Sequence, residues 1–219
     1  MMKNKKKRML VTGALCFFLV SFALIGPVMS DVEKPEYEVL SSNNFIEMRK
    51  YAPMIIAEVE VKGTRDQAIG NGFRILADYI FGNNIAQKSI AMTAPVQQQN
   101  HEKIAMTAPV QQQSDGDMWK VSFVMPSAYD LDTLPQPKNK KVKLKHIATK
   151  HFLAIRFSGT NSDRNVEAHQ DKLMLYVQDH KFKTTGTPKY AFYNPPWTLP
   201  FMRRNEVMIE VDVSKDRGL

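Results

Sequence analysis

The order of two helix patterns and eight strand patterns constrains the fold of this chain more than any other sequence feature. The first predicted helix opens at Thr64 and stops at Gly82, and its apolar stripe consists of Ile69, Phe73, Leu76 and Ile80. Asn161 and Ser162 can cap a second helix, whose stripe consists of Val166, His169, Leu173, Tyr176 and His180. In each half of the chain, two strand patterns precede the helix and two follow it.

The strand patterns cover residues 45–51, 54–61, 90–96 and 119–125 in the first half, and 142–147, 151–157, 189–193 and 206–213 in the second. Thr64 and Gln67 have the spacing of a capping box, which fixes the start of the first helix. The sequence therefore predicts an α+β fold. We expect a distorted antiparallel eight-stranded sheet or barrel, made of two βαββ-like halves, with two helices packed outside it.

Gly70 and Gly72 lie inside the first predicted helix, where each glycine costs about 1 kcal/mol relative to alanine. Two explanations remain open for them. Either the helix packs closely against a sheet at these positions, or the missing side chains leave room for a flat ligand.

Residues 1–30 predict an export signal. A basic stretch at residues 3–8 is followed by a charge-free apolar run from Leu10 to Met29, and residues 28–30 fit a cleavage site before Asp31. The run is also long enough to span a bilayer, so a cleaved signal peptide and an uncleaved inner-membrane anchor both remain open. In either case we expect residues 31–219 to be exported, as a periplasmic domain or one anchored facing the periplasm.

Charge and cysteine content exclude several functional classes. The formal net charge is +8, and five of these charges lie in the leader, so the rest of the chain carries +3. With no helix-turn-helix, zinc-finger or RNP-type motif, the sequence predicts no nucleic-acid partner. The single cysteine, Cys16, excludes a disulfide framework and a cysteine-rich zinc site.

A literal repeat occupies the middle of the chain. Residues 90–99 and 104–113 both read IAMTAPVQQQ. The apolar alternation predicts two antiparallel strands joined by a polar loop, or one copy in the sheet and one looped out. Because the first copy directly follows the helix, we expect it to enter the sheet, and Pro95 and Pro109 are expected at an edge or strand end.

Catalytic motifs do not emerge from the sequence. There is no GxSxG, HExxH, GxGxxG or P-loop pattern, and no catalytic residue is predicted. A binding protein is therefore expected in preference to an enzyme.

Several stretches together resemble the SOUL haem-binding family: AIGNGFRILADYIFG (68–82), IAMTAPV (90–96 and 104–110), FVMP (123–126), IRFSG (155–159) and YNPPWTLPFMRRNEVMIEV (193–211). The resemblance covers about residues 37–213 and implies a distorted antiparallel barrel of two matched halves. It also implies non-covalent binding of haem or porphyrin in an open apolar cleft beside the first helix. Together with the leader, this predicts an exported carrier or buffer.

Carried onto this sequence, the resemblance implies a ligand wall of Ile69, Phe73, Leu76 and Met92. Arg203 and Arg204 are expected to face the ligand's carboxylates through bidentate pairs. The family shares no single axial ligand, so the iron ligand stays unknown, with His101, Met92 and Met106 as weak candidates.

Two other functions remain open. Similar halves occur in GyrI-like proteins, which suggests a small-molecule binder or a hydrolase. Alternatively, the chain is an envelope interaction protein with a vestigial cleft. A buried acid with a raised pKa would favour the hydrolase.

Overall fold

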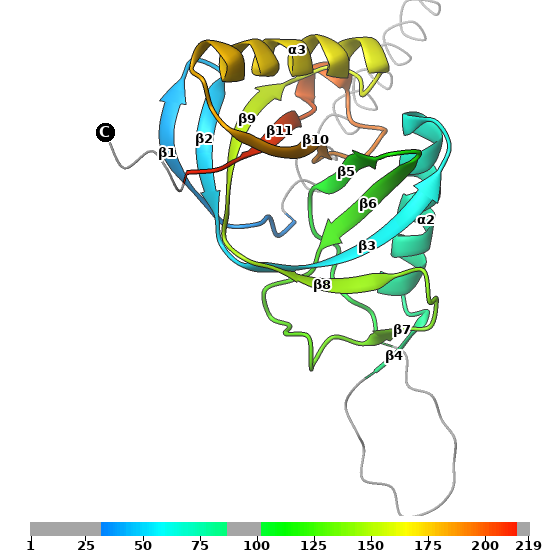
Figure 1. The fold of residues 1–219 in the computed structure, drawn as a ribbon. Coiled ribbons are helices and arrows are strands. Elements are labelled where there is room, and N and C mark those ends of the chain that lie inside the picture. Colours follow the sequence, from blue (N-terminus) through cyan, green and yellow to red (C-terminus); the bar gives the residue numbers. More distant parts are fainter. Residues whose placement is uncertain (1–31, 87–101, 214–219) are drawn as a thin grey trace, which may run out of the picture.

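The computed structural model describes residues 32–86 and 102–213, and within these ranges it contains two α-helices and one large antiparallel sheet (Figure 1). In chain order the elements are β1 (Tyr37–Asn43), β2 (Ile46–Tyr51), β3 (Met54–Lys62), α2 (Arg65–Ile80), β4 (Asn84–Ile85), β5 (Val110–Asp115), β6 (Met118–Val124), β7 (Gln136–Pro137), β8 (Lys143–Ile147), β9 (Lys150–Phe157), α3 (Asp163–Asp179), β10 (Thr184–Phe192), the 3-10 helix η1 (Pro200–Met202) and β11 (Asn205–Val211).

The large sheet has nine strands in the order β1-β2-β9-β11-β10-β5-β6-β3-β8, and every neighbouring pair is antiparallel. It does not close into a barrel. Within it, β5-β6-β3 with α2 and β10-β11-β9 with α3 repeat the same arrangement, which confirms the two predicted halves. The halves join where β10 pairs with β5.

Each half also contributes an edge strand to the other. β2 comes directly before β3 in the chain but pairs with β9, and β8 comes directly before β9 but pairs with β3. The short connections at Ala52-Pro53 and Ala148-Thr149 therefore carry the chain from one half to the other.

Both helices cover the same face of the sheet. Val110 belongs to the core under α2, and its antiparallel partner Phe192 packs against the core under α3. Directly paired residues point to the same side of a sheet, so the two helices lie over the same face of the sheet. The Thr64–Gln67 capping box starts α2 as predicted, whereas Ser162 caps α3 without a side-chain hydrogen bond.

The fold differs from the prediction in its strand count. The additional ninth strand, β1, is exposed along nearly its whole length. It gives no alternation of buried and exposed positions, so the pattern that reveals a half-buried strand is absent.

The structure describes only the second copy of the repeat, so the expected strand in the first copy stays a prediction. The second copy supplies the strand between β10 and β6, and that strand begins only at Val110. Residues 104–109 form an irregular segment instead of a strand, with Pro109 immediately before β5, as expected for a strand end. The first copy lies outside the described residues.

In residues 32–86 and 102–213, neither helix combines the length and the apolarity needed to cross a membrane.

The two helix glycines provide a matched stability test. A Cβ on Gly72 would lie 2.6 Å from the Cβ of Val121, whereas a Cβ on Gly70 would meet nothing within 4 Å. Gly72→Ala is expected to destabilise the protein by about 1–3 kcal/mol through overpacking. Gly70→Ala should stabilise it by about 0.5–1 kcal/mol through helix propensity. Urea denaturation at neutral pH measures the change in the free energy of unfolding for each variant. A stabilising effect of Gly72→Ala would contradict the close packing of α2 on Val121.

Candidate functional site

The flank of α2 that faces β5 carries part of the predicted ligand wall. Phe73 is 37% exposed, and its ring lies 5.5 Å from the ring of Phe123 in an edge-to-face contact. Ile69 is half-buried beside it on the same helix flank. Leu76, in contrast, is fully buried in the core under α2, so it supports this surface from behind.

Residues 102–109 run between the end of α2 and the end of β6. The Ile104 amide donates to the Ile80 carbonyl at 2.8 Å, and the Thr107 hydroxyl donates to the Val124 carbonyl. Met106, between these two anchors, remains 38% exposed. This segment therefore leads from the end of α2 to β5 with Met106 exposed on its surface.

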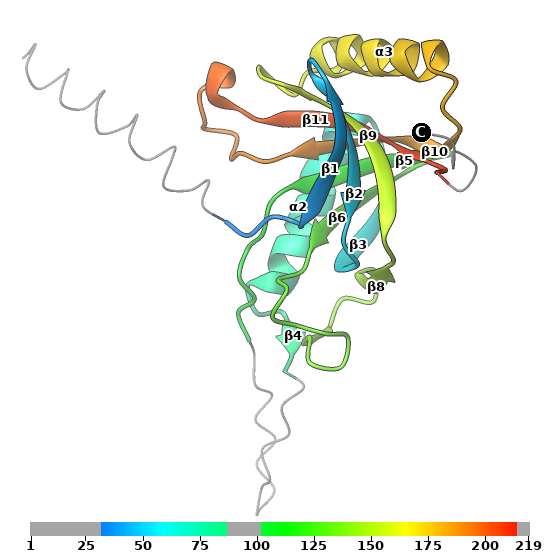
Figure 2. The ribbon, with the colours of Figure 1, turned by 90° about the vertical axis from the view of Figure 1, so that its left-hand side faces the viewer.

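The loop between β10 and β11 lies next to this segment. Phe192 pairs with Val110, so the residues that follow β10 continue alongside those that precede β5. Figure 2 shows the loop and the segment on the same side of the molecule. The loop exposes four large apolar side chains: Trp197, Leu199, Phe201 and Met202. Together with Ile69, Phe73 and Met106 we call these residues the apolar surface.

Arg203 and Arg204 are engaged within this loop and at its base. Arg203 donates through Nε to the Thr198 carbonyl at 2.7 Å and through Nη2 to the Pro196 carbonyl. Arg204 donates through Nε to Glu206 at 2.9 Å. Both arginines therefore hold the loop in place, and a bidentate pair with a ligand carboxylate would require them to leave these partners.

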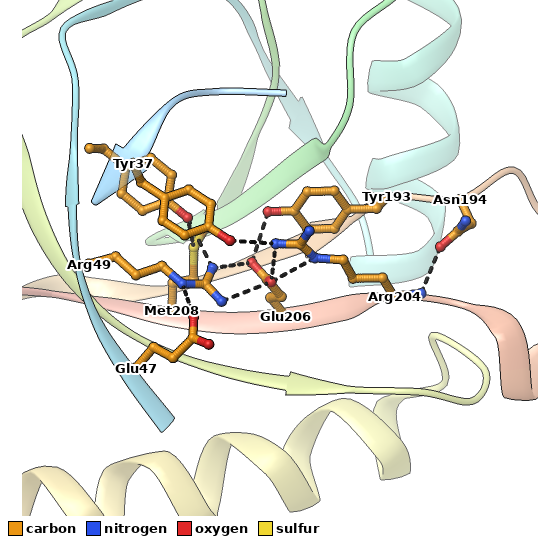
Figure 3. A network of polar contacts seen from close by, with 9 residues as sticks. Tyr37, Glu47, Arg49, Tyr193, Asn194, Arg204, Glu206 and Met208 are labelled. Atoms are coloured by element: carbon orange, nitrogen blue, oxygen red, sulfur yellow. Dashed lines mark hydrogen bonds and ion pairs between the residues drawn. The ribbon is translucent and has the colours of Figure 1, made fainter. Parts of the chain in front are cut away.

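A buried ion-pair network fixes the base of the loop from the face of the sheet opposite the helices (Figure 3). Glu206 is fully buried and accepts hydrogen bonds from Arg49 Nη1 at 2.8 Å, from Arg49 Nη2 at 3.2 Å and from the Tyr193 hydroxyl at 2.8 Å. The loop closes where the Arg204 amide donates to Asn194 Oδ1 at 2.6 Å. The network thus joins β2 and β11 to the loop that carries Trp197 and Phe201.

The charge state of this network argues against acid–base catalysis. Burial alone would raise the pKa of Glu206, but the hydrogen bonds and charges of Arg49 and Arg204 outweigh it and hold that pKa below its usual value. Burial and the charge of Glu206 raise the pKa of Tyr51 to about 12 and also raise the pKa of Tyr193. At neutral pH the carboxylate is ionised and paired, and both phenols are neutral.

Of the three candidate iron ligands, Met106 is the one that lies within the described residues. Met92 and His101 lie outside the described residues, and Met106 lies on the apolar surface. On α3, His169 stacks on Phe157 with ring centroids 4.1 Å apart, and His180 stacks on Tyr176 at 3.9 Å. The described ranges contain no group of three or more His, Cys, Asp or Glu side chains that could hold a metal ion.

Sequence reasoning missed the network of Arg49 and Glu206. Both residues lie within strands, where a charged side chain normally indicates a solvent-facing position. The available signal was that β11 reads NEVMIEV, with Glu206 next to an otherwise apolar run.

Removing the Glu206 carboxylate should destabilise the fold strongly. Glu206→Ala leaves the buried Arg49 and the half-buried Arg204 without their shared partner, and we expect a loss of about 3–5 kcal/mol in the free energy of unfolding. Glu210→Ala on the same strand removes a partly exposed pair with Lys150 and should cost at most about 1 kcal/mol. Urea denaturation at pH 7 compares the free energies of unfolding of the two variants, and equal losses of stability would contradict the special role of Glu206.

Acid should weaken the network in a way that depends on Glu206. Because its pKa is lower in the folded state than in the unfolded chain, the ionised carboxylate stabilises the protein at neutral pH. The pKa of an unperturbed glutamate is about 4.3. The stabilisation is therefore lost as pH falls below this value, towards the lower pKa that Glu206 has in the folded protein. The free energy of unfolding should therefore fall more between pH 7 and acid in the wild type than in Glu206→Gln, and parallel curves would contradict this.

Comparisons with known proteins identify similar folds and the family of this chain. The C-terminal domain of EcmrR superposes with a TM-score of 0.56 at 12% identity, covering 80% of this chain and 98% of that chain. A hydrolase from Listeria innocua superposes at 0.50, with 12% identity and coverage of 79% and 94%. An uncharacterized conserved protein from Listeria innocua gives 0.51, with 14% identity and coverage of 78% and 94%. At these identities the likeness concerns the fold alone.

No curated protein matches the sequence. The family model described as "SOUL heme-binding protein" matches residues 32–210, which include both halves of the sheet, both helices and the apolar surface. The chain therefore belongs to the SOUL haem-binding protein family.

Proposed function

We propose that this protein binds haem or a related tetrapyrrole non-covalently on the apolar surface and acts as a carrier or buffer. The observation that carries the proposal is the family match over residues 32–210, within which the apolar surface lies.

The chemistry of the surface suits a macrocycle. Trp197 is 58% exposed and Phe201 is 73% exposed, on a loop that two arginines hold in place. A cluster of exposed large apolar side chains is unusual for a monomeric surface and marks a binding site. Burying about 400 Å² of apolar surface would contribute about 10 kcal/mol before the costs of association, which is compatible with micromolar affinity.

Iron coordination is a separate part of the proposal. Met106 offers a thioether on the apolar surface, and thioether ligation of haem iron is known chemistry. Met92 and His101 stay as further candidates outside the described residues. If Met106 coordinates iron, Met106→Leu should alter the absorption of bound hemin and leave the affinity for iron-free protoporphyrin unchanged.

A hydrolase function receives no support from the buried carboxylate. The hydrolase alternative calls for a buried acid with a raised pKa, and Glu206 instead has a lowered pKa and two arginine partners. Ligand binding without catalysis is therefore the function we favour.

We further propose that residues 1–30 direct the protein to the periplasm, either as a cleaved signal or as an anchor in the inner membrane. The basic start, the uncharged apolar run and the small side chains near Asp31 support this proposal. Mass spectrometry of the N-terminus of protein taken from cell membranes distinguishes a chain that starts at Asp31 from one that retains its leader. A full-length chain found only in the cytoplasm would contradict export.

A hemin titration tests the proposed ligand. Purified full-length protein should shift the Soret band of hemin and saturate at micromolar concentration. Phe73→Glu places a charge on the apolar surface and should weaken binding at least about tenfold, equivalent to about 1.4 kcal/mol.

Phe45→Glu is the matched control, because Phe45 is 76% exposed in the turn between β1 and β2 and does not belong to the apolar surface. It should bind hemin like the wild type. Circular dichroism checks that both variants fold. Equal affinity of folded Phe73→Glu and Phe45→Glu would remove α2 from the site, and failure of the wild type to bind either hemin or protoporphyrin would refute the proposed function.

A further inference from the structure

A hollow of ≈ 770 Å³ lies on the other flank of α2, between this helix and the sheet edge formed by β3 and β8. The helix contributes Asn71, Arg74 and Ile75, and none of the residues of the apolar surface lines it. At 3.6 residues per turn, Asn71 and Ile75 lie on the opposite side of the buried stripe from Phe73. The hollow is therefore distinct from the proposed tetrapyrrole surface.

Positive charge predominates around this hollow. It is lined by five cationic side chains, Lys62, Arg74, Lys141, Lys143 and Lys145, and by two carboxylates, Glu58 and Glu60. Both carboxylates have neighbouring cations of their own. Glu58 pairs with Lys145 at 2.6 Å and lies directly opposite Lys143 in the β3–β8 register. Glu60 lies directly opposite Lys120, whose amine pairs with Asp115 at 2.6 Å.

The other four cations form no ion pair with a described residue, although Lys143 lies directly opposite Glu58. The amines of Lys62, Lys141 and Lys143 form no hydrogen bond or ion pair with any residue in 32–86 or 102–213. Arg74 donates only to the neutral amide of Asn71, at 2.6 Å.

Val61 faces α2, so Lys62 and Glu58 lie on the other face of β3, and Lys143 shares that face because it pairs with Glu58. The hollow therefore extends around the open edge of β3 and is bordered by cations from both faces, an arrangement that favours a bound anion.

Apolar side chains and an open strand edge complete the site. Val61, Ile75 and Met118 also line the hollow. β8 pairs with β3 only from Met54 to Glu58, so no strand covers the β8 side of the last residues of β3 within the described ranges. The volume falls among those of small-molecule sites, about 300–1,000 Å³, and exceeds what a single phosphate needs.

We propose that this hollow is a second binding site, which takes an organic polyanion with a flat apolar body and at least two acidic charges, about the size of a nucleoside diphosphate. The four cations that form no ion pair would hold the acidic groups, and the apolar body would lie against Val61 and Ile75 on the helix side of the edge. The site does not depend on tetrapyrrole binding.

Calorimetric titration of the full-length protein with ADP, pyrophosphate and adenosine, in low-salt buffer with a chelator, tests the proposal. ADP should bind at one saturable site with a Kd below about 1 mM. It should bind at least about fivefold more tightly than pyrophosphate, equivalent to about 1 kcal/mol, because pyrophosphate lacks the apolar body. Adenosine should not bind.

The double variant Lys62→Ala/Lys143→Ala should weaken ADP binding at least about fivefold. Lys172→Ala/Lys183→Ala is the matched control, because it removes the same charge from an exposed surface of the other half. Phe73→Glu should leave ADP affinity unchanged. Absence of saturation, equal losses in the two lysine variants, pyrophosphate binding as tight as ADP, or loss of ADP binding in Phe73→Glu would each overturn the proposal.

Discussion

The buried carboxylate of Glu206, shared by Arg49 and Arg204, is the interaction on which the rest of this structure depends. The charges of Glu206 and Arg49 are withdrawn from water here and that of Arg204 partly so, at a cost in desolvation free energy that close pairing offsets. The pairing is possible only if β2, which belongs to the first half, lies beside the strands of the second half. The network therefore specifies which strands may be neighbours, and it fixes the base of the loop that carries Trp197 and Phe201.

The sequence correctly predicted those features of the fold that depend on interactions between residues close in the chain. The Thr64–Gln67 capping box marks the start of α2, and the apolar stripes locate both helices. These features need only residues a few positions apart, so they can be found in a single sequence. The family resemblance, carried by stretches in both halves, agrees with the family match.

Long-range features escaped prediction for physical reasons. The turn at Ala52-Pro53 looks the same whether its flanking strands pair with each other or with distant partners, so the pairing of β2 with β9 is invisible to a local pattern. β1 is an exposed edge strand without alternation. Two identical copies of IAMTAPVQQQ cannot indicate by their letters which one enters the sheet. Likewise, a helix stripe does not distinguish Leu76, which is buried in the core, from Phe73, which reaches the surface.

The two flanks of α2 differ in chemistry although they belong to one helix. One flank, with Phe73, continues into exposed apolar side chains, and the other, with Arg74, borders a hollow rich in lysine. The buried stripe between them packs tightly on the sheet, to the point that Gly72 leaves no room for a Cβ next to Val121. A rigid helix of this kind can present two separate surfaces whose occupancies need not affect each other.

The crossing of β2 and β8 between the halves has a consequence for how such a chain can arise and fold. Either half alone would lack the strand that its counterpart provides, and would have to obtain it from a second copy of itself. The single chain is thus equivalent to a strand-swapped homodimer whose subunits have been fused. Its contacts join residues about a hundred positions apart, so assembly of the complete sheet has to await synthesis of nearly the entire polypeptide.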